Sequence, residues 1–164
     1  MSNFHLRKID IIVYALCLAA VIGMFVYAAA TRSTLPEQIP THYSLTGKIN
    51  GYGGRSSVFM MPVVLLVLLP TLIITGMIPA AWNLPGVKVT KANAPYITAC
   101  VRNMMDGMLL TITATMTTFF VCQVRNTNVP IFVLPLMLVL FLVNIIYCIV
   151  QTRRISRNTP ADPE

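Results

Sequence analysis

Residues 130–151 read PIFVLPLMLVLFLVNIIYCIVQ and contain no charged side chain. The hydrocarbon core of a bilayer is about 30 Å thick, so an α-helix needs about 20 apolar residues to cross it. Because lipid offers no hydrogen-bond partners, a segment this apolar must pair its backbone groups internally, as a helix does. This stretch therefore predicts a membrane-spanning helix.

Three more apolar stretches of similar length precede it, and we expect spans at residues 11–30, 58–81, 105–124 and 130–151. The expected fold class is an all-α membrane protein with four transmembrane helices. Residues 1–152 are expected to form one domain, and residues 153–164 a flexible cytoplasmic tail.

The first span has an alternative interpretation. Arg7 and Lys8 precede it, and Ala28-Ala29-Ala30 near its end resembles a signal-peptide cleavage site. The apolar part of a signal peptide is usually about 7–15 residues long, and this run is longer. The length therefore favours a retained span over a cleaved signal.

The composition supports a membrane protein. Apolar residues make up 56% of the 164-residue chain and charged residues 10%, against about 25% charged residues in soluble domains. The mean hydropathy is +0.74. These values exclude a soluble enzyme, a disordered tail and a free nucleic-acid-binding domain. The four cysteines, Cys17, Cys100, Cys122 and Cys148, form no CxxC pair and predict neither a disulfide framework nor a metal site.

The net charge of +7 is explained by membrane topology, because the basic residues flank the apolar runs. If both termini are cytoplasmic, eight basic residues lie inside: Arg7, Lys8, Lys88, Lys91, Arg102, Arg153, Arg154 and Arg157. Four then lie outside: Arg32, Lys48, Arg55 and Arg125. This bias predicts cytoplasmic N and C termini, and no nucleic-acid partner is expected.

Polar residues within the spans need partners, because they are costly in lipid. Gly107, Thr111, Thr115 and Thr118 recur at helical spacing and predict a helix-packing face, to which Asn144 of the fourth span can hydrogen-bond. The threonine hydroxyls can also bond to carbonyls of their own helix. A polar transport path along this face is the alternative.

Two further features of the spans bear on transport. Arg102 and Asp106 are four residues apart, so they are expected to pair at the inner boundary of the third span. Pro62, Pro70 and Pro79 each remove a hydrogen bond from the second span and can kink it. Neither feature is specific for a transporter.

The connection at residues 31–57 is the least ordinary segment. Pro36 and Pro40 hold its entry extended, and the alternation over residues 41–45 predicts a short strand. Turns are predicted at Thr46-Gly47 and Asn50-Gly51. We therefore expect a compact, ordered extracytoplasmic loop between the first two helices.

The residues of this loop resemble a bacterial family. The pattern Leu-Pro-x-x-Ile-Pro-x-His-x-x-x-x-Gly-x-x-Asn-Gly-x-Gly-x-Arg is similar to the N-terminal domain shared with SdpI-type immunity and signalling proteins. His42, Gly47 and Arg55 match the family motif, whereas Asn50 stands where the family usually has Asp. This departure loses a negative charge and weakens any metal or salt-bridge role at position 50. The candidate loop residues are Pro36, Pro40, His42, Gly47, Asn50, Gly51 and Arg55.

The resemblance implies a protein of the bacterial inner membrane, with immunity against, or sensing of, a secreted antimicrobial protein or peptide. On this interpretation the outer loop engages the toxin, the basic inner segments hold a cytoplasmic regulator, and the lipid bilayer surrounds the helices. A homo-oligomer is left open. The alternatives are a small transporter, an accessory or scaffold subunit, and a membrane enzyme that uses His42.

His42 itself is open to three interpretations: a structural group that fixes the loop, a pH sensor or partner contact, and a catalytic or ligating group. The structural interpretation is favoured. His42 with Asn50 and Glu37 is a poor metal set, since stable zinc sites use about three or four strong protein ligands. We therefore expect no catalytic residue, no metal and no cofactor.

Overall fold

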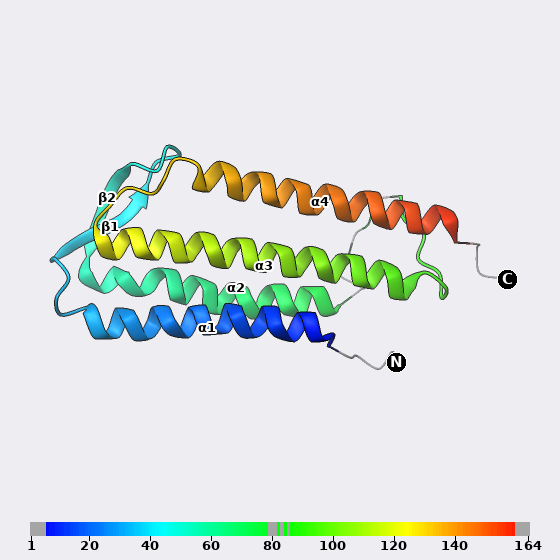
Figure 1. The fold of residues 1–164 in the computed structure, drawn as a ribbon, viewed down its shortest axis with the longest axis horizontal. Helices are drawn as coiled ribbons and strands as arrows, with labels where there is room; N and C mark the ends of the chain where they lie inside the picture. Colours follow the sequence, from blue (N-terminus) through cyan, green and yellow to red (C-terminus); the bar gives the residue numbers. More distant parts are fainter. Residues whose placement is uncertain (1–5, 79–81, 83, 85, 160–164) are drawn as a thin grey trace.

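The computed structural model describes residues 6–78, 82, 84 and 86–159. Four helices run side by side along the long axis: α1 (Lys8–Thr31), α2 (Met60–Met77), α3 (Ala94–Arg125) and α4 (Val133–Asn158). A hairpin of β1 (Gln38–Tyr43) and β2 (Ile49–Gly54) closes one end, and a short 3-10 helix, η1 (Arg55–Phe59), leads into α2. The N-terminus of α1 and the C-terminus of α4 lie toward the opposite end (Figure 1).

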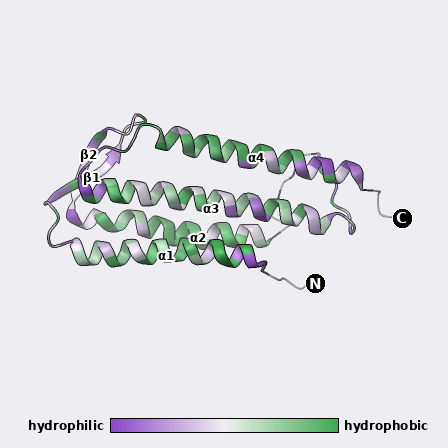
Figure 2. Cartoon of the chain, in the orientation of Figure 1, coloured by the Kyte–Doolittle hydropathy of each residue, from purple (hydrophilic) through white to green (hydrophobic). Residues whose placement is uncertain are grey.

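All four helical segments are long and apolar enough to cross a membrane, in the ranges Lys8–Thr31, Arg55–Met77, Ala94–Arg125 and Val133–Asn158. Figure 2 shows hydrophobic residues along most of α2 and α4, with hydrophilic residues gathered at the hairpin and at the helix ends near the termini. The chain is thus a multi-pass membrane protein with a mostly helical fold. Ala28 to Ala30, the cleavage-like residues, lie inside α1, and Ala28 is buried.

The helix bounds differ from the expected ones. α3 begins at Ala94 instead of residue 105, because the Asn93 side chain accepts a hydrogen bond from the Thr90 amide and Pro95 suits a first helical turn. α4 ends at Asn158 instead of residue 151, so part of the expected flexible tail is helical. The Ser156 hydroxyl bonds the Lys88 amide and carbonyl at 2.8 and 3.1 Å, which holds this helix end.

The second helix ends at Met77, and the expected end at residues 79–81, including Pro79, lies outside the described residues. Pro62 falls in the first turn of α2, where its missing amide would lack a helical partner in any case. Pro70 lies inside the helix and removes one backbone bond.

The two strands pair antiparallel, with Gln38 opposite Gly54 and Tyr43 opposite Ile49. The register shifts on both sides of His42, so Thr41 and Asn50 are extra residues in their strands. Asn50-Gly51 therefore belongs to β2 and not to a turn, which corrects the expectation for this dipeptide. The turn at Gly47 has the expected positive φ, of 78°.

α3 is the centre of the bundle, since it packs against α1, α2 and α4. Near the hairpin, Val21, Ala28, Ile39, Leu65 and Phe120 belong to one buried apolar cluster that joins α1, β1, α2 and α3. The hairpin is thereby continuous with the helical core.

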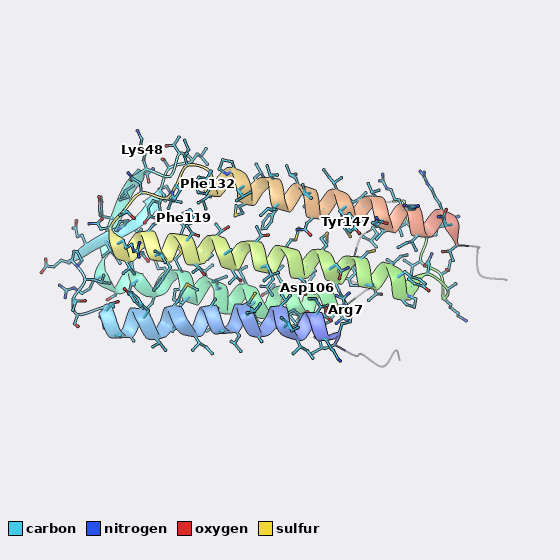
Figure 3. The ribbon with its side chains drawn as sticks, viewed as in Figure 1. Arg7, Lys48, Asp106, Phe119, Phe132 and Tyr147 are labelled. Atoms are coloured by element: carbon cyan, nitrogen blue, oxygen red, sulfur yellow. The ribbon has the colours of Figure 1, made fainter. Side chains whose placement is uncertain are left out.

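A charge-balanced cluster joins α1 to α3 at the end with the termini (Figure 3). Asp10 is fully buried, pairs with Arg102 of α3, and bonds Arg7 at 2.5 Å. Arg7 also reaches Asp106 at 3.4 Å and donates to Asn103 at 2.7 Å. Arg102 and Asp106, expected to pair with each other, are thus each joined to α1.

The two arginines and two aspartates of this cluster balance one another in charge. The hydrogen bond to Asp10 raises the pKa of Arg7 above its ordinary value. Removing one partner leaves an uncompensated buried charge, which costs far more than an exposed pair contributes.

We expect Asp10→Asn to lower the free energy of unfolding by about 3–5 kcal/mol, because Arg7 and Arg102 keep their charges while the buried Asp10 carboxylate is lost. Lys8→Gln, an exposed neighbour, is the matched control and should change stability by less than about 0.5 kcal/mol. The measurement is unfolding of the detergent-solubilised protein, followed by circular dichroism. Equal stability of the two variants would show that the cluster does not hold α1 to α3.

Candidate functional site

The hairpin is fastened to α3 by a buried glutamine. Gln123 is 0% exposed, and its Nε2 donates to the carbonyl oxygen of Pro40 at 2.8 Å and to that of Ser57 at 3.4 Å. One side chain therefore holds both β1 and η1 against the end of the helix. Sequence reasoning missed this residue, although a lone amide in an apolar run was the signal, since such a group needs a partner in lipid.

The turn of the hairpin is fastened to the α3–α4 connection, residues 126–132. The Val129 amide donates to the Gly47 carbonyl at 2.9 Å, and the Ile49 amide donates to the Asn128 side chain at 3.0 Å. A Cβ on Gly47 would lie 2.0 Å from the Val129 carbonyl oxygen, so the two backbones touch directly. Gly47 is thus a packing position as well as a turn residue.

Tyr43 fixes the end of β1. Its ring meets Phe119 of α3 edge to face, with centroids 5.3 Å apart and planes at 86°. Its hydroxyl is buried without a hydrogen-bond partner among the described residues, and burial raises the pKa of Tyr43 to about 12. The ring packs on α3, and the hydroxyl adds nothing to that contact.

The structure brings together His42 and Asn50, two of the residues singled out from the sequence. His42 Nδ1 lies 2.5 Å from Asn50 Oδ1 across the irregular part of the hairpin, and both side chains are exposed. The amide oxygen is an acceptor, so this contact selects the tautomer with a proton on Nδ1. This contact links the two strands of the hairpin.

Of the other predicted loop residues, Pro36, Pro40 and Arg55 lie apart from that pair, whereas Gly51 lies beside it. Pro36 is exposed before β1, while Pro40 is buried and presents its carbonyl to Gln123. Arg55 begins η1 at the far end of β2, where its amide donates to the Glu37 carbonyl at 3.0 Å. Gly51 faces His42, and a Cβ there would lie 2.9 Å from the His42 Cβ.

Several side chains project from the fastened hairpin. Leu45 at the turn is 88% exposed and Tyr52 of β2 is 57% exposed. Lys48 protrudes beside them, at the outer edge in Figure 3. These side chains, with His42 and Asn50, form the exposed face of the hairpin.

Residues that could bind a metal ion do not gather here. Within residues 6–78, 82, 84 and 86–159, no three His, Cys, Asp or Glu side chains lie close enough to hold a metal ion. The four cysteines are unpaired thiols, three of them buried.

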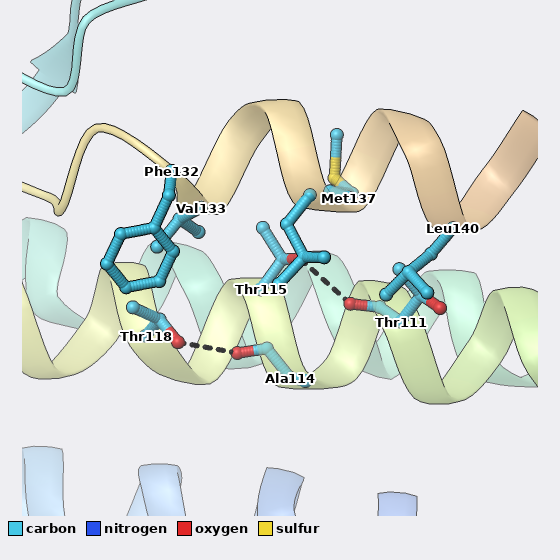
Figure 4. A pocket seen from close by; sticks show the side chains of 9 residues that line it. Thr111, Ala114, Thr115, Thr118, Phe132, Val133, Met137 and Leu140 are labelled. Atoms are coloured by element: carbon cyan, nitrogen blue, oxygen red, sulfur yellow. Dashed lines mark hydrogen bonds between the residues drawn. The ribbon is translucent and has the colours of Figure 1, made fainter.

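The threonine face of α3 looks toward α4 and lines a pocket of about 170 Å³ (Figure 4). The hydroxyls of Thr111, Thr115 and Thr118 bond back to carbonyls of α3 at 2.8–2.9 Å. Their methyl groups therefore complete an apolar wall with Phe132, which directly precedes α4, and with Met137 of α4.

Below the pocket, Gly107 meets Asn144, whose Oδ1 would lie 2.6 Å from an added Cβ. Asn144 donates to the Leu140 carbonyl of its own helix at 3.3 Å, and not to the threonines as expected.

The segment that contains the hairpin also matches a known protein family. Residues 19–66 match a family described as a domain of unknown function (DUF1648). The match runs from the second half of α1 through the hairpin and η1 into α2. No curated protein and no solved structure matches the chain.

Gly47→Ala is expected to lower stability by at least about 2 kcal/mol, because the left-handed backbone disfavours a Cβ by about 1–2 kcal/mol and the Val129 carbonyl blocks it as well. Gly86→Ala is a matched control, since Gly86 also has a positive φ (74°) but its Cβ would meet only Arg153 Nε at 3.9 Å. Thermal unfolding of both variants in detergent is the measurement. Similar losses of stability in the two variants would show that the close contact between Gly47 and Val129 does not add to the cost of the Gly47 substitution.

Tyr43→Phe should change the alkaline stability. The unfolded chain ionises Tyr43 near pH 10, while the folded chain keeps it protonated up to about pH 12, so wild-type stability falls as the pH rises through this window. Tyr43→Phe removes the contribution of Tyr43 to that fall and should leave stability at neutral pH equal or slightly higher. Unfolding temperatures at about pH 8 and about pH 11 test this, with Tyr52→Phe as the exposed control. An unchanged alkaline fall in Tyr43→Phe would contradict it.

Proposed function

We propose that the chain binds a secreted antimicrobial protein or peptide through the exposed face of its hairpin, in an immunity or sensing role of the kind known from SdpI-type proteins. The observation that carries this proposal is a hairpin held by buried contacts to α3 and to the α3–α4 connection, while its exposed Leu45 and Tyr52 side chains take no part in those contacts. Gln123, Gly47 and Tyr43 make the anchoring contacts. Leu45 and Tyr52 remain exposed.

Such an arrangement favours recognition on physical grounds. A surface already ordered before binding loses little conformational entropy when a partner arrives. Exposed tyrosine and leucine side chains supply contact area, and tyrosine is enriched among the residues that dominate binding energies. The family match at residues 19–66 covers this hairpin, which supports a role for the hairpin itself.

The proposed orientation has the hairpin outside and both termini in the cytoplasm of a bacterium. It rests on the excess of basic residues at the end with the termini, following the positive-inside rule. The same basic end is the proposed contact for a cytoplasmic regulator. The retained first span is supported by Asp10, which pairs with Arg102 and Arg7.

The alternatives have weaker support. A transport path along α3 would need free polar groups, whereas Thr111, Thr115 and Thr118 direct their hydroxyls to their own helix. A His42 enzyme would need a second titratable partner, whereas the neighbour of His42 is Asn50. The bilayer-embedded binding protein therefore remains the proposal.

The test is survival of a sensitive bacterium that expresses the chain and is challenged with a panel of secreted antimicrobial proteins and peptides. We expect the wild type to protect, and Leu45→Ala with Tyr52→Ala to reduce survival at least about tenfold, as loss of about 1.4 kcal/mol of binding would. His42→Ala should also weaken protection. Tyr96→Ala, an exposed tyrosine at the other end, is the matched control and should protect like the wild type.

Insertion is verified by labelling Lys48→Cys with a membrane-impermeant thiol reagent on intact cells. Labelled protein that protects against no member of the panel would contradict the immunity role. If the variant with Leu45→Ala and Tyr52→Ala still protects like the wild type, the exposed face of the hairpin takes no part in the immunity role.

A further inference from the structure

A second pocket lies at the hairpin end of the bundle, on the outside of the α1–α3 contact. It measures about 170 Å³ and is lined by Tyr27, Phe120, Val121, Val124 and Arg125. The Tyr27 and Phe120 rings meet edge to face at 6.1 Å, with an angle of 78° between their planes. Four of the five lining residues are thus apolar or aromatic, and the fifth is a cation.

Arg125 is the last residue of α3, where a membrane-spanning segment reaches the headgroup level. It is exposed, and no partner for its guanidinium occurs among the residues that the structure describes. Arg32, the basic residue that follows the end of α1, donates instead to the Ser56 hydroxyl at 2.9 Å. Arg125 is therefore a cation with unused hydrogen-bond donors above an apolar pocket.

We propose that this pocket binds a membrane phospholipid, with the phosphate on Arg125 and part of an acyl chain along Tyr27, Phe120, Val121 and Val124. The guanidinium fork matches two phosphate oxygens, and a charge-assisted pair of this kind is among the strongest hydrogen bonds in proteins. An apolar cavity of about 150 Å³ is known to take up a molecule the size of benzene, so this pocket has room for a stretch of hydrocarbon chain.

The location favours a lipid over other occupants. The pocket is lined by Tyr27 of α1 and Val121 of α3, which are exposed on helices long and apolar enough to cross the bilayer. A second copy of the chain would have to offer a carboxylate to Arg125, and at this end the described residues provide Glu37 alone. This inference is independent of the proposed recognition of a toxin or peptide.

The test is native mass spectrometry of the delipidated, detergent-purified full chain, titrated with three probes: phosphatidylglycerol, diacylglycerol with the same acyl chains, and inorganic phosphate. We expect tight binding of phosphatidylglycerol, weaker binding of diacylglycerol and no competition from inorganic phosphate. Arg125→Gln should lower the phosphatidylglycerol affinity about tenfold and leave that for diacylglycerol unchanged.

Two more variants complete the design. Val121→Trp fills the pocket from its exposed edge and should weaken both lipids, whereas Lys48→Gln removes a cation at the same end, away from the pocket, and should change neither. If Val121→Trp does not fold, the Arg125→Gln result is sufficient to test the lipid-binding proposal. Equal phosphatidylglycerol affinity in the wild type and in Arg125→Gln would overturn the proposal. Displacement of bound phosphatidylglycerol by inorganic phosphate would also overturn it. So would a lipid-free dimer of the wild type that the Arg125→Gln substitution dissociates.

Discussion

The structure depends on one constraint, which is that the polar side chains of α3 must find partners inside an apolar bundle. Lipid tails are as apolar as leucine, so association of the other helices with α3 gains little from the hydrophobic effect. Specific polar contacts take its place. Arg102 and Asp106 bind residues of α1, Gly107 admits Asn144 of α4, and Gln123 reaches past the helix bundle to the hairpin.

These contacts give the two ends of the bundle different properties. At the end with the termini, four charges balance one another and hold α1 in place. At the hairpin end, the partners are neutral backbone carbonyls, such as that of Pro40, and an aromatic pair, Tyr43 and Phe119. Anchoring by buried neutral groups leaves the outward side chains of the hairpin free to meet a partner.

The helices and the hairpin turn were predictable from the sequence, whereas the partners of the buried polar side chains were not. Hydropathy predicts the four helices because lipid permits few other backbone structures. Local patterns also predict a strand after Pro40 and a turn at Gly47. The partner of a buried polar group depends on which helices become neighbours in the fold. Local sequence patterns therefore predict neither the ion pair between Asp10 and Arg102 nor the hydrogen bond from Gln123 to Pro40. The same reasoning explains the placement of Asn50, because strand register depends on both strands.

The matched segment, residues 19–66, contains only part of what holds its hairpin in place. Ile39 packs in an apolar cluster that lies mostly within this segment. Gln123, Asn128 and Val129, which bind Pro40, Ile49 and Gly47, lie in α3 or the connection after it. An isolated two-stranded hairpin is at best marginally stable in water. Its order here therefore depends also on the later helices, and any recognition by the hairpin is a property of the whole bundle. A change at Gln123, far from the exposed face in sequence, acts on that face by altering the backbone that presents it.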